Sequence, residues 1–181
     1  MQIGYVVGMV IGAFLMLSVS GLILNMNQSS GSLSLYETAK IEHKTTMDFL
    51  KSDFRMIGYR YDDQHIIHPG EGNVDSTRIR FRYRPLDSQD ELDIRWRIEE
   101  YDDERNRLVR REDGDEQVIN NNLSKDSYFA YYDESGNPTQ QPNQIQKIKF
   151  FMETLPRAQW GDGKLKTRTE TTVVPPNLQL N

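Results

Sequence analysis

The chain opens with a long uncharged stretch and becomes strongly charged only afterwards. Residues 3–24 are apolar except for four glycines, two serines and Tyr5, and the first charged residue is Glu37. As an α-helix rising about 1.5 Å per residue, this stretch would reach about 33 Å, close to the hydrocarbon thickness of a bilayer. The pattern therefore predicts a transmembrane helix over about 3–24.

A cleaved secretory signal is the alternative interpretation of this opening stretch. Ser18 and Ser20 would then be the small residues before a cut at Gly21. The apolar run exceeds the 7–15 residues usual for a signal core, and no Lys or Arg precedes it. Both observations favour a retained anchor.

Small residues recur along this helix at a spacing that suits contact with other helices. Gly4, Gly8 and Gly12 are four residues apart and share one stripe, which allows a second helix in lipid to approach closely. Glycine is also simply common in membrane helices, so the spacing alone leaves both explanations open. We expect packing and assembly to involve the following residues: Gly8, Gly12, Phe14, Leu17, Gly21 and Leu24.

A second helical pattern follows a polar, uncharged zone over 25–34. This zone predicts either a linker or a weakened turn within one longer helix, because Gly31 and its serine neighbours have poor helix propensity. Further on, apolar residues return at spacings of three and four, which predicts an amphipathic helix docked on its own domain. Gly58 lies where that helix would end. The stripe consists of Met47, Leu50, Phe54, Ile57 and Tyr61.

From Asp75 onward, the periodicity changes to the alternation of half-buried antiparallel strands. Asp113-Gly114 predicts a hairpin turn, and a polar loop is expected over 133–143. The predicted strands cover 77–84, 91–98, 107–112, 116–119, 128–132, 145–152 and 164–174. One apolar face carries Ile79, Phe81, Tyr83, Leu92, Ile94, Trp96 and Ile98. We therefore expect a two-layer α+β protein, with an N-terminal helix over 1–61 packed on an antiparallel sheet within a β-rich domain over 62–181.

The opposite face of the first two strands is rich in arginine. It could form a basic patch for an acidic partner, a phosphate backbone or lipid headgroups. The alternative is a solvated face neutralised by Glu91, Asp93 and Glu99, and this is the interpretation we favour. The candidate patch consists of Arg78, Arg80, Arg82, Arg95 and Arg97.

Composition and motifs argue against an enzyme. The 181 residues carry a net charge of −5 with no cysteine, so neither bulk nucleic-acid binding nor a thiol nucleophile is expected. His65 and His68 form an H-x-x-H pair without the glutamate of a zinc helix, and the chain has no G-x-S-x-G or Walker motif. We expect no catalytic, cofactor or metal site, although the acidic loops near 99–105, 111–116 and 131–137 contain oxygen ligands suited to calcium.

The order of these parts resembles type IV pilin-like proteins, specifically the W-type minor pilins and the J-type pseudopilins of type II secretion. Five stretches resemble the family's segments in order along nearly the whole chain. They are VVGMVIGAFLML, FLKSDFRMIGY, YFAYYDESGNP, QIQKIKFFMETLP and VVPPNLQL.

The resemblance implies a single-pass anchor in the bacterial cytoplasmic membrane and a periplasmic or extracellular body. It also implies processing at Gly4-Tyr5, and assembly with other pilin-like subunits in a filament or tip complex. Two positions depart from the family pattern: Met9 stands where the family carries a glutamate, and Pro176 stands where it carries an arginine. The missing glutamate is compatible with a tip subunit, a true start further upstream, or an anchor that is never processed.

Two function classes follow from the sequence. The first is a non-enzymatic minor subunit that primes, caps or builds a type IV pilus or a type II secretion pseudopilus. The second is a membrane-tethered extracytoplasmic binding or sensor domain that does not polymerise. Recovery of other single-helix pilin-like proteins with the chain would distinguish them.

Overall fold

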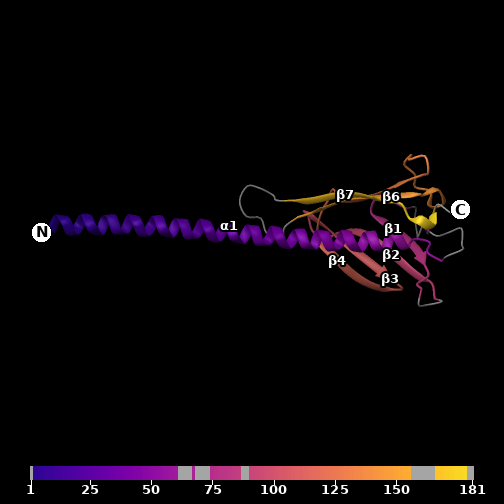
Figure 1. Cartoon of the computed structure of the whole chain (residues 1–181), viewed down its shortest axis with the longest axis horizontal. Coiled ribbons are helices and arrows are strands. Elements are labelled where there is room, and N and C mark those ends of the chain that lie inside the picture. Colours follow the sequence, from indigo (N-terminus) through magenta and orange to yellow (C-terminus); the bar gives the residue numbers. More distant parts are fainter. Residues whose placement is uncertain (1, 61–66, 68–73, 87–89, 156–165, 179–181) are drawn as a thin grey trace.

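A computed structural model of the chain describes residues 2–60, 67, 74–86, 90–155 and 166–178. It consists of one long helix, α1 (Gln2–Met56), packed on an antiparallel sheet of seven strands. The first half of α1 projects from the body as a free rod, and its second half lies across the sheet (Figure 1). The α+β class predicted from the sequence is confirmed.

Helix α1 runs without a break through the polar zone over 25–34. Of the two expectations for this zone, the linker is therefore wrong and the continuous helix is right. Serine and threonine side chains here bond to the carbonyl of the preceding turn: Ser32 Oγ donates to Ser29 O at 2.9 Å, and Thr38 Oγ1 to Ser34 O at 2.9 Å. These bonds occupy side chains that could otherwise compete for the helix backbone.

The helix ends at Met56, a few residues before the predicted limit at 61. Gly58 takes a left-handed φ of 70° just beyond the end, as expected of a glycine that terminates a helix. Its N–H donates to Arg82 O at 3.1 Å, which ties the helix end to the first strand. Tyr61 and the predicted domain boundary lie outside the described residues.

The strands follow the predicted alternation closely. They are β1 (Arg78–Tyr83), β2 (Leu92–Glu100), β3 (Arg105–Glu112), β4 (Asp115–Ser124), β5 (Tyr128–Tyr132), β6 (Lys147–Thr154) and β7 (Thr167–Val173). The strand order is β1-β2-β3-β4-β6-β5, with β7 also paired to β6. The largest difference from prediction is β4, which continues to Ser124 because its second half covers the helix with Asn120, Asn122 and Leu123. The hairpin turn is confirmed, with Asp113 and Gly114 at φ 46° and 104°.

The apolar stripe of α1 forms the centre of the core. Met47, Leu50, Phe54 and Ile57 are all at most 3 % exposed. The Phe54 ring meets the edges of three further rings, on β1, β5 and β6, with centroids 5.5–6.1 Å apart. One helix side chain therefore joins strands from both halves of the sheet.

Polar contacts hold the part of α1 that precedes this stripe. Asn120 Nδ2 donates to Thr46 Oγ1 at 3.1 Å, and Asn122 Nδ2 donates to Glu42 Oε2 at 3.1 Å. The predicted stripe began at Met47, so these polar contacts of Glu42 and Thr46 were not predicted from the sequence.

Asp53 directly precedes Phe54 of the apolar stripe and lies against the sheet. It accepts hydrogen bonds from Trp96 Nε1 at 2.9 Å and from Arg110 Nε at 2.6 Å. This half-buried carboxylate therefore connects α1 to both β2 and β3.

His43 couples the helix contact to pH. Its ring nitrogens lie 3.0 Å from Thr154 Oγ1 and 2.9 Å from Thr169 Oγ1, and the side chain is buried. Burial, aided by the charge of Lys51, lowers the pKa of His43 below its usual value of 6.5. The folded state therefore binds fewer protons than the unfolded state, and stability is lost as pH falls through the unfolded value toward the lower folded one.

We expect His43→Gln to reduce the loss of unfolding free energy between about pH 7.5 and pH 5.5, the range that contains the unfolded histidine value. The measurement is denaturant unfolding of the variant and the unchanged chain in detergent at both pH values. The other titratable groups are common to both chains. The test is therefore whether the difference in unfolding free energy between the two chains changes with pH. A difference independent of pH would contradict the role of His43.

Candidate functional site

The first half of α1 is a long apolar surface that the body of the molecule does not cover. From Gly4 to Ser30 every residue is exposed, and Tyr5, Phe14 and Leu17 are each about 70 % exposed. Among the described residues, α1 is the one helix long and apolar enough to span a membrane or to act as a signal sequence. None of its most apolar stretch is buried in the molecule, so it is not a core helix of the domain.

The predicted assembly residues all lie on this exposed rod. An added Cβ at Gly4, Gly8, Gly12 or Gly21 would meet no other atom of the chain within 4 Å. The fold of the body therefore gives no reason for glycine at these positions. Whether Gly4-Tyr5 is a processing junction stays a prediction.

The assembly residues form two surfaces rather than one. Because α1 is unbroken, each residue turns the helix by about 100°. Gly4, Gly8 and Gly12 then share one side with Tyr5, which we call the glycine face. On roughly the opposite side lie Phe14, Leu17, Gly21 and Leu24, which we call the Phe14 face. The projecting half of α1 can therefore contact helices on two sides at once.

The arginine face is largely neutralised within the sheet, as the sequence favoured. Asp93 pairs with Arg80 at 2.7 Å and with Arg82 at 3.6 Å, and Glu91 pairs with Arg84 at 3.2 Å. The remaining pairs are Arg78–Asp75, Arg97–Glu99, Arg97–Glu116 and Arg107–Glu99. Of the five predicted patch residues, Arg95 is the exception, since among the described residues it has no ion pair.

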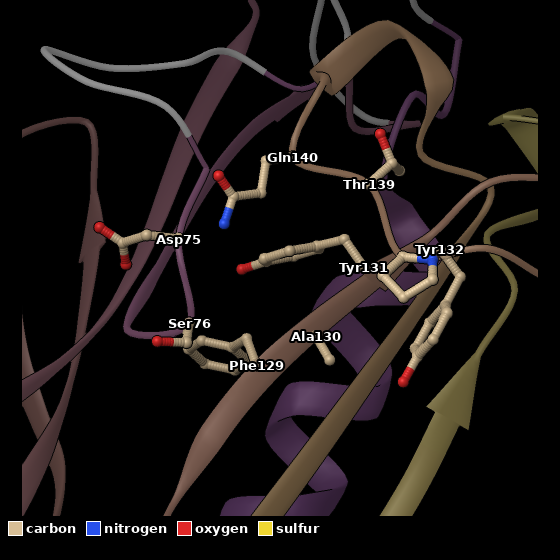
Figure 2. A pocket seen from close by; sticks show the side chains of 9 residues that line it. Asp75, Ser76, Phe129, Ala130, Tyr131, Tyr132, Thr139 and Gln140 are labelled. Atoms are coloured by element: carbon tan, nitrogen blue, oxygen red, sulfur yellow. The ribbon is translucent and has the colours of Figure 1, made fainter.

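A separate cavity of about 390 Å³ lies beside β5. Figure 2 shows Tyr131, Gln140 and Thr139 around it, with Asp75 and Ser76 on the other side. Tyr131 Oη donates to Arg78 O at 2.9 Å, so its polar end is already occupied. Among the described residues that line it, Asp75 is the one charged side chain.

The acidic loops use their carboxylates to hold turns. Asp102 Oδ1 accepts the N–H groups of Glu104 and Arg105, and Asp133 Oδ1 accepts that of Asn137. Hydrogen bonds from Arg105 lower the pKa of Asp102, and those from Asn137 lower the pKa of Asp133. No three His, Asp or Glu side chains gather as a metal site in the part of the chain that the structure describes. His65 and His68 lie outside that part.

Sequence reasoning missed Arg111, which β3 places directly opposite Arg95. The Asp113-Gly114 turn fixes the register of β3 against β4 only, so the pairing of β2 with β3 had to come from the structure.

No protein-family model, curated protein or solved structure matches this chain. The architecture itself is pilin-like: a long, apolar N-terminal helix whose second half packs on an antiparallel sheet.

Proposed function

We propose that this chain is a non-enzymatic minor pilin or pseudopilin. In this role it primes, caps or builds a type IV pilus or a type II secretion pseudopilus through helix–helix packing. The finer resemblance, to W-type minor pilins and J-type pseudopilins, belongs to the same proposal. So does the location, with the anchor in the bacterial cytoplasmic membrane and the body outside the cytoplasm.

The proposal rests on one observation: the chain presents an exposed apolar rod, continuous with a helix that is firmly docked on its own sheet. Lipid can cover such a rod while the subunit is stored in the membrane. Neighbouring helices can cover it in an assembly, where small residues permit close approach. The docked half keeps the rod aligned with the body in both settings.

The two faces of the rod support a filament more than a simple anchor. A lone anchor requires only an apolar surface, and a symmetric dimer requires one contact face. A subunit inside a helical bundle has neighbours on several sides. The glycine face and the Phe14 face supply two contact surfaces on roughly opposite sides of α1.

The competing function is a tethered binding or sensor domain that does not polymerise. The cavity beside β5 is the observation that favours it, since such a domain needs a site for a ligand. Under this alternative the rod stays in lipid, and neither of its faces contacts a protein.

Purification from the native membrane in mild detergent separates the two functions. We expect other single-helix membrane proteins to be recovered with the full chain, and intact-mass spectrometry to show a mature start at Tyr5. An unprocessed chain recovered without such partners would favour the tether and contradict the filament proposal.

A further inference from the structure

Three arginines form a row across the outer face of the sheet. In the strand register, Arg80 on β1 lies opposite Arg95 on β2, and Arg95 lies opposite Arg111 on β3. Like charges directly opposite each other on neighbouring strands are destabilising. A row of this kind therefore calls for counter-charges.

The nearby carboxylates compensate only one end of the row. Both carboxylate oxygens of Asp93 accept a hydrogen bond from Arg80 Nε, each at 2.8 Å. Asp113 Oδ1 accepts the Asp93 N–H at 3.0 Å. Among the described residues, Arg95 and Arg111 have neither a hydrogen bond nor an ion pair from their guanidinium groups.

The two unpaired guanidiniums line a common cleft of about 300 Å³. Its other walls are Arg80, Asp93, Asp113 and Gly114. Burial is the main cause that lowers the pKa of Arg95; the charges of Arg80 and Arg111 lower it further, and the charge of Asp93 opposes them. The cleft has room for one small oxyanion and several waters, since a water takes about 30 Å³.

We propose that the Arg95–Arg111 cleft binds a single carboxylate, the Asp or Glu side chain of a protein partner. This inference is independent of the proposed helix packing, and it adds the outer sheet face to the two contact faces of the rod. Guanidinium groups suit a carboxylate because they offer paired N–H donors in one plane. Asp93 already makes this kind of contact beside the cleft, with Arg80 Nε 2.8 Å from Oδ1 and Arg80 Nη2 2.7 Å from Oδ2.

The surroundings of the cleft disfavour two other anionic partners. Asp93 and Asp113 flank it and would repel the successive phosphates of a nucleic acid. Lipid headgroups are distant from the cleft. Arg110 precedes Arg111 on β3 and pairs with Asp53 on α1. Asp53 lies about 44 Å along the helix from Leu24, where the predicted transmembrane segment ends.

The test is an acetate titration of the full-length, ¹⁵N-labelled chain in detergent micelles, with chloride replaced at constant ionic strength. We expect the Nε–H signals of Arg95 and Arg111 to shift together and to saturate. Arg95→Gln and Arg111→Gln should each weaken acetate binding by about tenfold, the effect of losing one charge-assisted hydrogen bond. Arg107→Gln is the matched control, since Arg107 is also on β3 but is already paired with Glu99.

Three results would overturn the proposal. The first is a shift that does not saturate, and the second is an equal loss of binding in Arg107→Gln. The third comes from a parallel titration with oligothymidylates: displacement of acetate with an affinity that grows with oligonucleotide length would assign the cleft to nucleic acid instead. Because Arg111 is exposed, its substitution leaves the core untouched and keeps the test valid if Arg95→Gln fails to fold.

Discussion

Replacing Gly8 and Gly12 together by leucine is expected to abolish most recovery of partner subunits with the chain. The leucines would push a neighbouring helix away from the glycine face, where close approach is the source of the packing energy. A loss of about 2 kcal/mol at such a contact corresponds to roughly thirtyfold weaker association. The measurement is the amount of partner recovered with each variant from membranes, relative to the amount of the chain itself.

The isolated subunit should tolerate these substitutions. An added Cβ at either glycine meets no atom of the chain, and leucine favours a helix more than glycine does. Ser20→Leu is the matched control, since Ser20 lies on the same rod in the gap between the two faces. Equal partner recovery from the double variant and the control would show that the glycine face makes no protein contact.

Phe54→Ala is expected to cost the domain about 3–5 kcal/mol of unfolding free energy, the range for deleting a buried phenylalanine. Phe54 is fully buried and touches rings on β1, β5 and β6, so its removal leaves a cavity between both halves of the sheet and α1. Urea unfolding of the full chain in detergent, followed by tryptophan fluorescence, measures the change.

Phe49→Ala supplies the control for this prediction. Phe49 is on the same helix but is 48 % exposed, so its truncation should cost less than about 1 kcal/mol. A similar loss in both variants would mean that the Phe54 cluster does not hold the helix on the sheet.

Sequence periodicity was sufficient for the elements and for the apolar half of the interface. Alternation predicted β1 and β2 with the correct buried face, and the spacing of Met47, Leu50 and Phe54 predicted the docked stripe. These patterns are readable because one face of each element is continuously apolar.

The polar contacts between α1 and the sheet could not be predicted from periodicity. The apolar spacing does not mark Asp53 or His43 as contact residues, yet both meet partners on strands more than forty residues away. Each partner is defined by strand register, which alternation alone does not fix. For the same reason, Arg111 was not part of the predicted basic patch: its position opposite Arg95 depends on the pairing of β2 with β3.

Site-specific photo-crosslinking in native membranes tests most directly whether the rod is a contact surface for other helices. The chain has no cysteine, so single cysteines at Val19 on the glycine side and at Leu17 on the Phe14 face can each carry a benzophenone label. Lys44→Cys, on the exposed side of the docked half, is the control. We predict adducts with other single-helix membrane proteins from both rod positions and none from Lys44→Cys. Lipid adducts alone from both rod positions would contradict it.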